Sequence, residues 1–339
     1  MPDTVSDSGP ASDSGAALDE LHAALTAGSY EHRVLTVVHR WYTGYETERR
    51  RLDHHGELVT EDFVAHRPAE SALPDVQGRQ AYLDGLATAY PGQSNAHHLR
   101  SVAIERTGAD TARAVVAHDF ETIGPTLNGA AVLRYDLELH QQPTERLPRI
   151  STFAEQILAP RDAPFTEALA ENRVLAFLHY WLALLEQPTA PSESSEPSEP
   201  AAPSVDVEPL RELLHPELVM TLSDGRVLHT FDQVAAWYTR NAEQVEISTH
   251  HLIDPVITPG QDGDHQLTVD FAWQGITRAA QPMTARTRHV WTLAETRERY
   301  LRLKRFHVDI VEPFTPTTAD QALAHHDAAR KLSQIAPTR

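Results

Sequence analysis

The chain has 339 residues, a formal net charge of −19 and 41% hydrophobic residues, which suits about two packed domains. This charge disfavours an electrostatic grip on nucleic acid or anionic lipid, and no run approaches the ~18 apolar residues of a membrane span. The sequence contains no cysteine, which excludes disulfides, thiolate metal sites and cysteine nucleophiles.

The first residues are acidic and lack the apolar stretch of a secretory signal. We expect residues 1–24 to form a disordered tail and the protein to be cytoplasmic. Only two basic residues are lysines, Lys304 and Lys331, and this bias toward arginine fits a GC-rich bacterial source.

One helical pattern occurs twice along the chain. "EHRVLTVVHRWYTGYE" (31–46) and "ENRVLAFLHYWLALLE" (171–186) both carry apolar residues at helical spacing. Seven of sixteen positions are identical without a gap: Glu31/Glu171, Arg33/Arg173, Val34/Val174, Leu35/Leu175, His39/His179, Trp41/Trp181 and Glu46/Glu186. The match predicts an internal duplication.

The similarity continues beyond the first helix. A short helix and turn is expected at 58–66 and at 213–221, and a longer helix at 78–90 and at 231–243. Alternating β-branched and aromatic residues then predict four strands in each half. The paired strands are 97–104 with 250–257, 118–124 with 269–275, 133–139 with 287–293, and 149–157 with 302–310.

This order predicts an α+β protein with two tandem domains, each with three helices on a curved antiparallel sheet. The expected domains are residues 25–160 and residues 166–314. The Pro-, Ser- and Glu-rich stretch at 188–204 cannot bury a core and is expected to be a disordered insertion in the second domain. Residues 315–339 are expected to form a C-terminal helix and tail.

The order of elements resembles the nuclear-transport-factor-2-like, or SnoaL-like, cone fold. "EDFVAHRP" (61–68), followed by "QGRQAYLDGLATAYP" (77–91), is similar to a stretch of SnoaL-like polyketide cyclases. "HHLRSV" (97–102) is similar to the histidine-bearing strand of the scytalone-dehydratase-like branch. The resemblance implies a pocket between the concave face of each sheet and its helices. The fold hosts isomerases, dehydratases, cyclases and binding modules, so function depends on the pocket.

Strand alternation selects candidate pocket residues in the first half. His118 lies between Val116 and Phe120 on an apolar face, and Tyr135 shares a face with the leucines around it. The resemblance to scytalone dehydratase implies an acid–base role for His97 and His118, with tyrosines beside them. The candidate catalytic residues are His97, His118, Tyr135 and Tyr42.

Histidine can exchange a proton near neutral pH, and a buried tyrosine can hydrogen-bond an enolate. We therefore expect the first domain to carry cofactor-free lyase or isomerase chemistry on a small apolar carbonyl or polyketide-like compound. The second half has Val269 in place of His118 and looks more aromatic, so we expect it to be a divergent partner that pairs with the first as an internal pseudo-dimer. The candidate ligand-binding residues are His66, Phe120, His250, Trp273 and His289.

Several alternatives stay open. His118 is also explained as an ordinary core residue, and His98 or His251 could be the inward member of its His-His pair. No acidic residue is evident beside the candidate histidines, which favours a non-catalytic ligand-binding or scaffold protein. His54 and His55, in an arginine-rich turn, are expected to be solvated.

Two other kinds of site are disfavoured. No set of histidines and carboxylates has a metal-binding spacing, so no metal site is expected. His66 and Arg67 stand where ketosteroid isomerase has its aspartate base, which argues against a steroid-isomerase mechanism.

Overall fold

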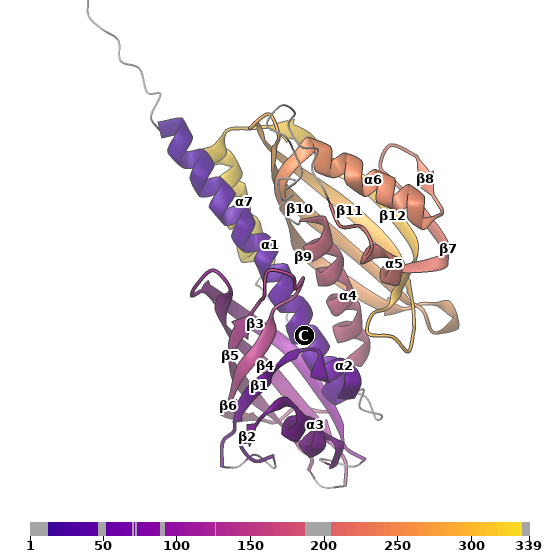
Figure 1. Cartoon of the computed structure of the whole chain (residues 1–339). Coiled ribbons are helices and arrows are strands. Elements are labelled where there is room, and N and C mark those ends of the chain that lie inside the picture. Colours follow the sequence, from indigo (N-terminus) through magenta and orange to yellow (C-terminus); the bar gives the residue numbers. More distant parts are fainter. Residues whose placement is uncertain are drawn as a thin grey trace, which may run out of the picture.

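The computed structural model describes residues 13–46, 52–69, 71, 73–88, 92–125, 127–186 and 205–333. Figure 1 shows two units, each with helices on a curved sheet. The first unit comprises α1 (Asp13–Glu46), α2 (Leu52–Gly56), β1 (Val59–His66), β2 (Val76–Gln77), α3 (Arg79–Thr88), β3 (Ser94–Arg106), β4 (Thr111–Ile123), β5 (Gly129–His140) and β6 (Arg149–Arg161).

The second unit repeats this order. It comprises α4 (Leu169–Leu185), α5 (Leu210–Leu213), β7 (Leu214–Thr221), β8 (Val227–Leu228), α6 (Phe231–Gln244), β9 (Val245–Pro259), a short 3-10 turn (Gln261–Gly263), β10 (His265–Thr277), β11 (Pro282–Ala294) and β12 (Arg302–Pro316). Helix α7 (Ala319–Ser333) follows, where a C-terminal helix was expected.

The two sheets have one topology. Their strand orders are β2-β1-β6-β5-β4-β3 and β8-β7-β12-β11-β10-β9. All neighbouring strands are antiparallel except β1 with β6 and β7 with β12, which are parallel. The predicted α+β class with two tandem domains of one design is confirmed.

The prediction of a short helix and turn at 58–66 and at 213–221 is wrong, because both segments form strands. In β1 the buried side chains are Val59, Phe63 and Ala65, and the last two follow the two-residue repeat of a strand. A run of eight residues is too short for its period to separate helix from strand, and here pairing with β6 decides. The three helices of the first unit are therefore α1, α2 and α3.

The tail expected over residues 1–24 is corrected in part, since α1 begins at Asp13 and runs for 34 residues. Leu21 and Leu25 have no exposed surface and pack with Ile247, Ile276 and Ala322 of the second unit and α7. Burial of these leucines holds the segment as helix despite its acidic residues. The remainder of the expected tail, residues 1–12, and the insertion expected at 188–204 lie outside the described residues.

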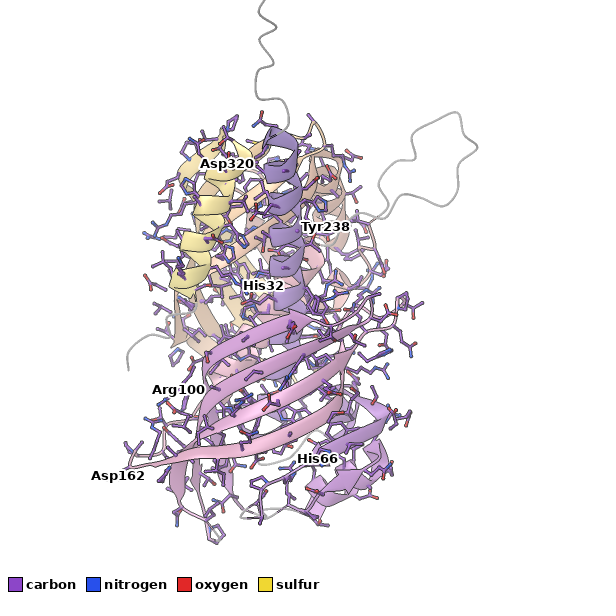
Figure 2. The ribbon with its side chains drawn as sticks, turned by 90° about the vertical axis from the view of Figure 1, so that its left-hand side faces the viewer. His32, His66, Arg100, Asp162, Tyr238 and Asp320 are labelled. Carbon is purple, nitrogen blue, oxygen red and sulfur yellow. The ribbon has the colours of Figure 1, made fainter. Side chains whose placement is uncertain are left out.

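Helix α1 makes many of the contacts between the halves. Helix α1 lies beside α4, and its N-terminal part lies beside α7 against β9, as Figures 1 and 2 show. Ser29 on α1 donates a hydrogen bond to the backbone oxygen of Glu186, at 3.0 Å. None of the helices in the described ranges combines the length and apolar character of a membrane span.

Candidate functional site

The strand registers show which residues of the two units are equivalent. His97 lies opposite Phe120, and His250 lies opposite Trp273. Tyr135 lies opposite Val116, and His289 lies opposite Val269. The expected match of 118–124 with 269–275 is therefore displaced by two residues: the equivalent of His118 is Phe271, and Val269 matches Val116. Displacement by two keeps every side chain on its expected face.

A glutamate holds a histidine in each unit. Glu46, at the end of α1, accepts a hydrogen bond from the backbone N–H of His97 at 2.7 Å, and its Oε1 lies 3.1 Å from His97 Nδ1. Glu186, directly after α4, accepts from the backbone N–H of His250 at 2.7 Å and lies 2.9 Å from His250 Nδ1. The absence of an acidic partner, expected from the sequence, is thus wrong.

The signal for these pairs was present in the repeat. Glu46 and Glu186 are the last identical positions of the duplicated helix, and His97 and His250 open matched strands. A carboxylate one helical turn after Tyr42 could therefore have been chosen together with its histidine.

The first histidine of each His-His pair faces the interior. His97 stacks on Tyr42 with ring centroids 4.7 Å apart. Its neighbour His98 instead reaches the backbone oxygen of Thr166 on the other face of the sheet, at 3.1 Å. In the second unit, His251 points to α7 and lies 3.0 Å from His326.

The four candidate catalytic residues of the first unit form one cluster. The rings of His118 and Tyr135 lie 4.3 Å apart, and those of His118 and Tyr42 lie 5.2 Å apart. All four side chains are buried, with at most 5% exposed. Burial, with His97 and His98 adding, lowers the pKa of His118 well below 6.5, and burial raises the pKa of Tyr42 and Tyr135 well above 10. All three groups are therefore uncharged at neutral pH.

Polar side chains also occupy the interior of the first unit beside this cluster. Arg67 reaches Glu155 at 3.1 Å, and the hydroxyls of Tyr45 and Tyr82 lie 2.6 Å apart. His55 also lies 2.6 Å from the Tyr82 hydroxyl and is only 2% exposed, so its expected solvation is wrong.

The two ligand-binding candidates of the first unit, Phe120 and His66, lie in different environments. Phe120 packs against His97, with centroids 5.2 Å apart. The side chain of His66 is 59% exposed and lies near Asp75, so its expected place in the pocket is wrong. His66 is the last residue of β1, where the alternation turns it away from Ala65.

The second unit contains a cavity of about 460 Å³. The strand registers and the repeat place Leu185, Leu222 and Val308 where the first unit has Tyr45, Arg67 and Glu155. All three smaller or apolar residues line the cavity. The space that polar side chains occupy in one unit is therefore open in the other.

Eight aromatic side chains lie along the cavity wall. They are Trp181, Trp237, Tyr238, Phe271, Trp273, Trp291, Phe306 and Phe314. Glu186 is part of the polar lining. The three ligand-binding candidates of this unit, His250, Trp273 and His289, also line the cavity. The lining extends to the exposed Asp224 and Arg226, so the cavity reaches the surface.

The electrostatics of the Glu186–His250 pair follow from burial. Burial lowers the pKa of His250 to about 3 and raises that of Glu186 to about 7. The backbone N–H of His250 and the hydroxyl of Thr249, at 3.3 Å, both donate to the Glu186 carboxyl. With Nδ1–H of His250 donated as well, the lone pair of the other ring nitrogen, Nε2, stays free.

Two further polar groups of the cavity lack a partner. Among the described residues, Nδ1 of His289 and Nε1 of Trp291 are buried without a hydrogen bond. His289 Nε2 lies 3.0 Å from the Thr287 hydroxyl, and burial lowers the pKa of His289 to about 3. Neither atom has accessible surface, so a ligand in the cavity reaches these two groups only when neighbouring side chains move.

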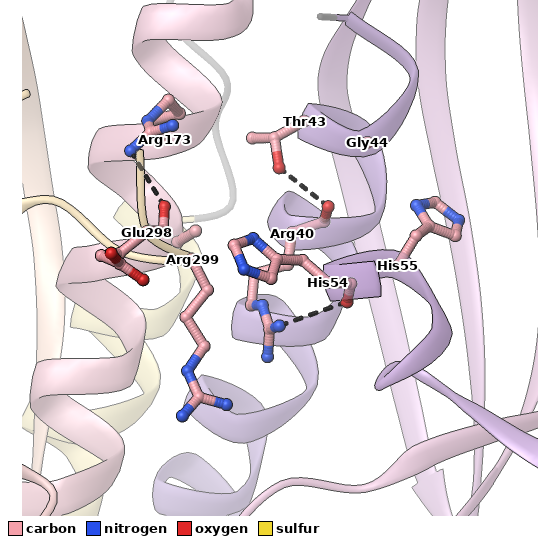
Figure 3. A pocket seen from close by; sticks show the side chains of 9 residues that line it. Arg40, Thr43, Gly44, His54, His55, Arg173, Glu298 and Arg299 are labelled. Carbon is pink, nitrogen blue, oxygen red and sulfur yellow. Dashed lines mark hydrogen bonds between the residues drawn. The ribbon is translucent and has the colours of Figure 1, made fainter. Parts of the chain in front are cut away.

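A second, much smaller cavity of about 30 Å³ lies beside α1, α2 and α4 (Figure 3). Its arginines are engaged: Arg40 pairs with Glu57 at 2.8 Å, and Arg173 with Glu295 at 3.1 Å. We assign this cavity to packing between helices. In the described part of the chain, no group of three or more His, Cys, Asp or Glu is placed to hold a metal ion.

No protein-family model matches this sequence, and a comparison with curated proteins found no match. Similar solved structures include a nuclear-transport-factor-2-like protein with a cystatin-like fold from Novosphingobium aromaticivorans, with 18% identity, a TM-score of 0.32, and coverage of 47% of this chain and 96% of that one.

Two further structures are similar to part of the chain. One is a hexachlorocyclohexane dehydrochlorinase from Novosphingobium barchaimii (12% identity, TM-score 0.34, 44% of this chain and 97% of that one). The other is a ketosteroid isomerase-like protein from Erwinia carotovora atroseptica (12% identity, TM-score 0.28, 44% and 99%). The two sheets of one topology confirm the expected tandem design of the fold, and each of these three solved structures is similar to less than half of this chain.

Proposed function

We propose that the cavity of the second unit is the active site of a lyase or isomerase that removes a proton from carbon in a small aromatic carbonyl compound. The observation that carries this proposal is the 2.9 Å contact between Glu186 Oε1 and His250 Nδ1 at the wall of a 460 Å³ aromatic cavity. The proton transfer requires only side chains of this chain and no cofactor.

In this mechanism His250 is the general base. Glu186 accepts its Nδ1–H, so Nε2 takes the proton from the substrate carbon, and the carboxylate stabilises the imidazolium that forms. Burial raises the pKa of Glu186 to about 7, so about half of the Glu186 carboxyls are ionised at that pH and can accept the Nδ1–H of His250. We assign the N–H of Trp291, which has no partner and becomes accessible only when neighbouring side chains move, as the donor to the developing enolate oxygen.

The proposed base lies in the second unit, whereas the sequence pattern favoured the first. The aromatic wall favours a flat, apolar substrate, which stacks on the rings and displaces water. A polyketide-like aromatic ketone has these properties.

The test uses 2-tetralone, an aromatic ketone with acidic C–H bonds next to its carbonyl. Exchange of these hydrogens for deuterium in D2O is followed by NMR. His250→Gln is expected to lower the exchange rate by about 10²- to 10⁴-fold, the range for loss of a general base. His251→Gln, which changes the neighbouring histidine on the other face of the sheet, is the control and should keep the rate.

Exchange by the unaltered protein no faster than by His250→Gln would overturn the proposal. A thermal shift with 2-tetralone in that case would support the non-catalytic ligand-binding alternative. A ligand at 100 times its dissociation constant stabilises by about 2.7 kcal/mol.

A second candidate function rests on the first unit. Within the described ranges, both ring nitrogens of His118 and the hydroxyl of Tyr42 are buried without a hydrogen bond. Such groups cost free energy unless a bound molecule satisfies them. We propose that a small polar ligand enters here when the surrounding side chains move apart, with His97, held by Glu46, as its base. If this unit performs the chemistry, His97→Gln rather than His250→Gln will abolish the exchange of 2-tetralone.

A further inference from the structure

Helix α1 brings a histidine to the Glu186–His250 pair from the other unit. His32 is 5% exposed, and its Nε2 lies 2.9 Å from the backbone oxygen of His250 and 3.6 Å from Glu186 Oε1. One turn earlier on the same helix, Ser29 donates to the backbone oxygen of Glu186. The pair in the second unit is thus held on one side by residues that belong to the first repeat.

Helix α4 makes the reciprocal contact. Asn172 occupies the position in the repeat that His32 has in the first helix. Its Nδ2 lies 2.9 Å and 3.1 Å from the two carboxylate oxygens of Glu46, and 2.9 Å from the backbone oxygen of His97. Equivalent positions therefore reach equivalent pairs across the boundary, in both directions.

The hydrogen bonds of His32 determine its tautomer. The backbone oxygen of His250 can only accept, so the proton of His32 is on Nε2. Its Nδ1 then accepts from Nδ1–H of His179, 2.9 Å away. Burial lowers the pKa of His32, so the ring is neutral at pH 7 and has both nitrogens engaged. A side chain constrained in this way has one orientation.

We infer that His32 is a positioning residue for the proposed base in the second unit: it fixes the backbone of His250 against Glu186, and each unit completes the glutamate–histidine pair of the other. This inference rests on the proposed function of the second unit and adds that the isolated second repeat lacks part of its own site. The other groups that face Glu186 are Arg33 from α1, Thr249 from β9 and Tyr238 from α6.

The test uses the full chain and compares His32→Ala with His32→Asn. Asparagine stands at the equivalent position in the other repeat, so His32→Asn should restore the contact that His32→Ala removes. His22→Ala, an exposed histidine on the same helix, is the control. Two measurements are made on each variant: the exchange rate of 2-tetralone, and the NMR resonance of His250 Nδ1–H in the ligand-free protein.

We expect His32→Ala to lower the exchange rate by about 10- to 100-fold, as for other groups that orient an active side chain. The Nδ1–H resonance should shift or broaden in His32→Ala, and His32→Asn should recover both the rate and the resonance. An unchanged resonance in His32→Ala, or a folded His32→Asn that has lost it, would overturn the inference.

The NMR measurement separates the two proposals. If the unaltered protein does not exchange 2-tetralone, the proposed function fails, and the resonance alone decides whether His32 positions His250. If exchange occurs and the His250 Nδ1–H resonance is the same in His32→Ala as in the unaltered protein, the proposed function stands and this inference fails.

Discussion

The rings of His39 and His179 stack 5.6 Å apart, with their planes within 7° of each other, where α1 meets α4. They are the matched histidines of the duplicated helix. Each also contacts the other helix at a matched position, since His39 Nδ1 lies 2.8 Å from Asn172 Oδ1 and His179 contacts His32. Equivalent positions of the two helices therefore make equivalent contacts around these rings.

The buried histidines at this contact predict a loss of stability in acid. Burial lowers the pKa of His32, His39 and His179. Below about pH 6.5 these three side chains are therefore protonated in the unfolded chain but stay neutral in the folded chain. Stability is therefore complete above the unfolded pKa and falls as pH drops, by up to about 1.4 kcal/mol per pH unit for each histidine. Melting temperatures between pH 8 and pH 5 measure this.

His179→Phe provides the comparison for that measurement. It keeps an aromatic ring in the stack and removes one titrating group. We expect the melting temperature of His179→Phe to fall less between pH 7 and pH 5 than that of the unaltered protein. If the melting temperatures of the two proteins fell equally with pH, the pKa of His179 would not be lowered in the folded protein.

Glu186→Gln is expected to lower 2-tetralone exchange by about 10²-fold or more, the scale on which loss of a general base is felt. The reason is the tautomer: the glutamine amide can donate to His250 Nδ1, which puts the proton on Nε2 and leaves no lone pair for the substrate. Glu217→Gln, on an exposed position of β7, is the control. Equal rates for Glu186→Gln and the control would contradict the proposed role of the carboxylate.

Leu25→Ala tests the place of the N-terminal part of α1. Leu25 is fully buried against the second unit, so its truncation should lower the free energy of unfolding by about 2–5 kcal/mol. Leu332→Ala, at a position 54% exposed on α7, should change it little. Urea titration of both variants makes the comparison, and equal midpoints would mean that this part of the helix contributes nothing.

His118→Leu distinguishes a packed core from a ligand site in the first unit. Without a bound molecule, leucine removes two buried unpartnered nitrogens, and the free energy of unfolding should stay equal or rise by about 1 kcal/mol. A loss of more than about 2 kcal/mol, together with loss of a thermal shift by small polar compounds, would support the second candidate function.

The sequence predicted best where a period continued over a whole strand. The inward orientation of His118 followed from Val116 and Phe120 alone, because alternate residues of a strand share a face. The length of α1 was not predictable locally, since Leu21 and Leu25 are helical and buried because of a surface on β9 and β10.

The cavity could not be predicted, because it depends on side-chain volumes that the periodicity of the sequence does not reveal. Leu185, Leu222 and Val308 lie far apart in sequence, and each looks like an ordinary apolar residue. Only the strand registers show that together they replace the larger polar side chains of the first unit. The glutamate–histidine pairs, by contrast, could have been found from the repeat.

The reach of α1 across both repeats has a consequence for biosynthesis. Leu21 and Leu25 leave the ribosome early, but Ile247, Ile276 and Ala322, against which they pack, are made only with the second repeat and α7. The first repeat can form its own sheet while one end of its longest helix still displays leucines to solvent. A nascent or truncated chain that stops after the first repeat is therefore expected to expose these two leucines until the second repeat and α7 have been made.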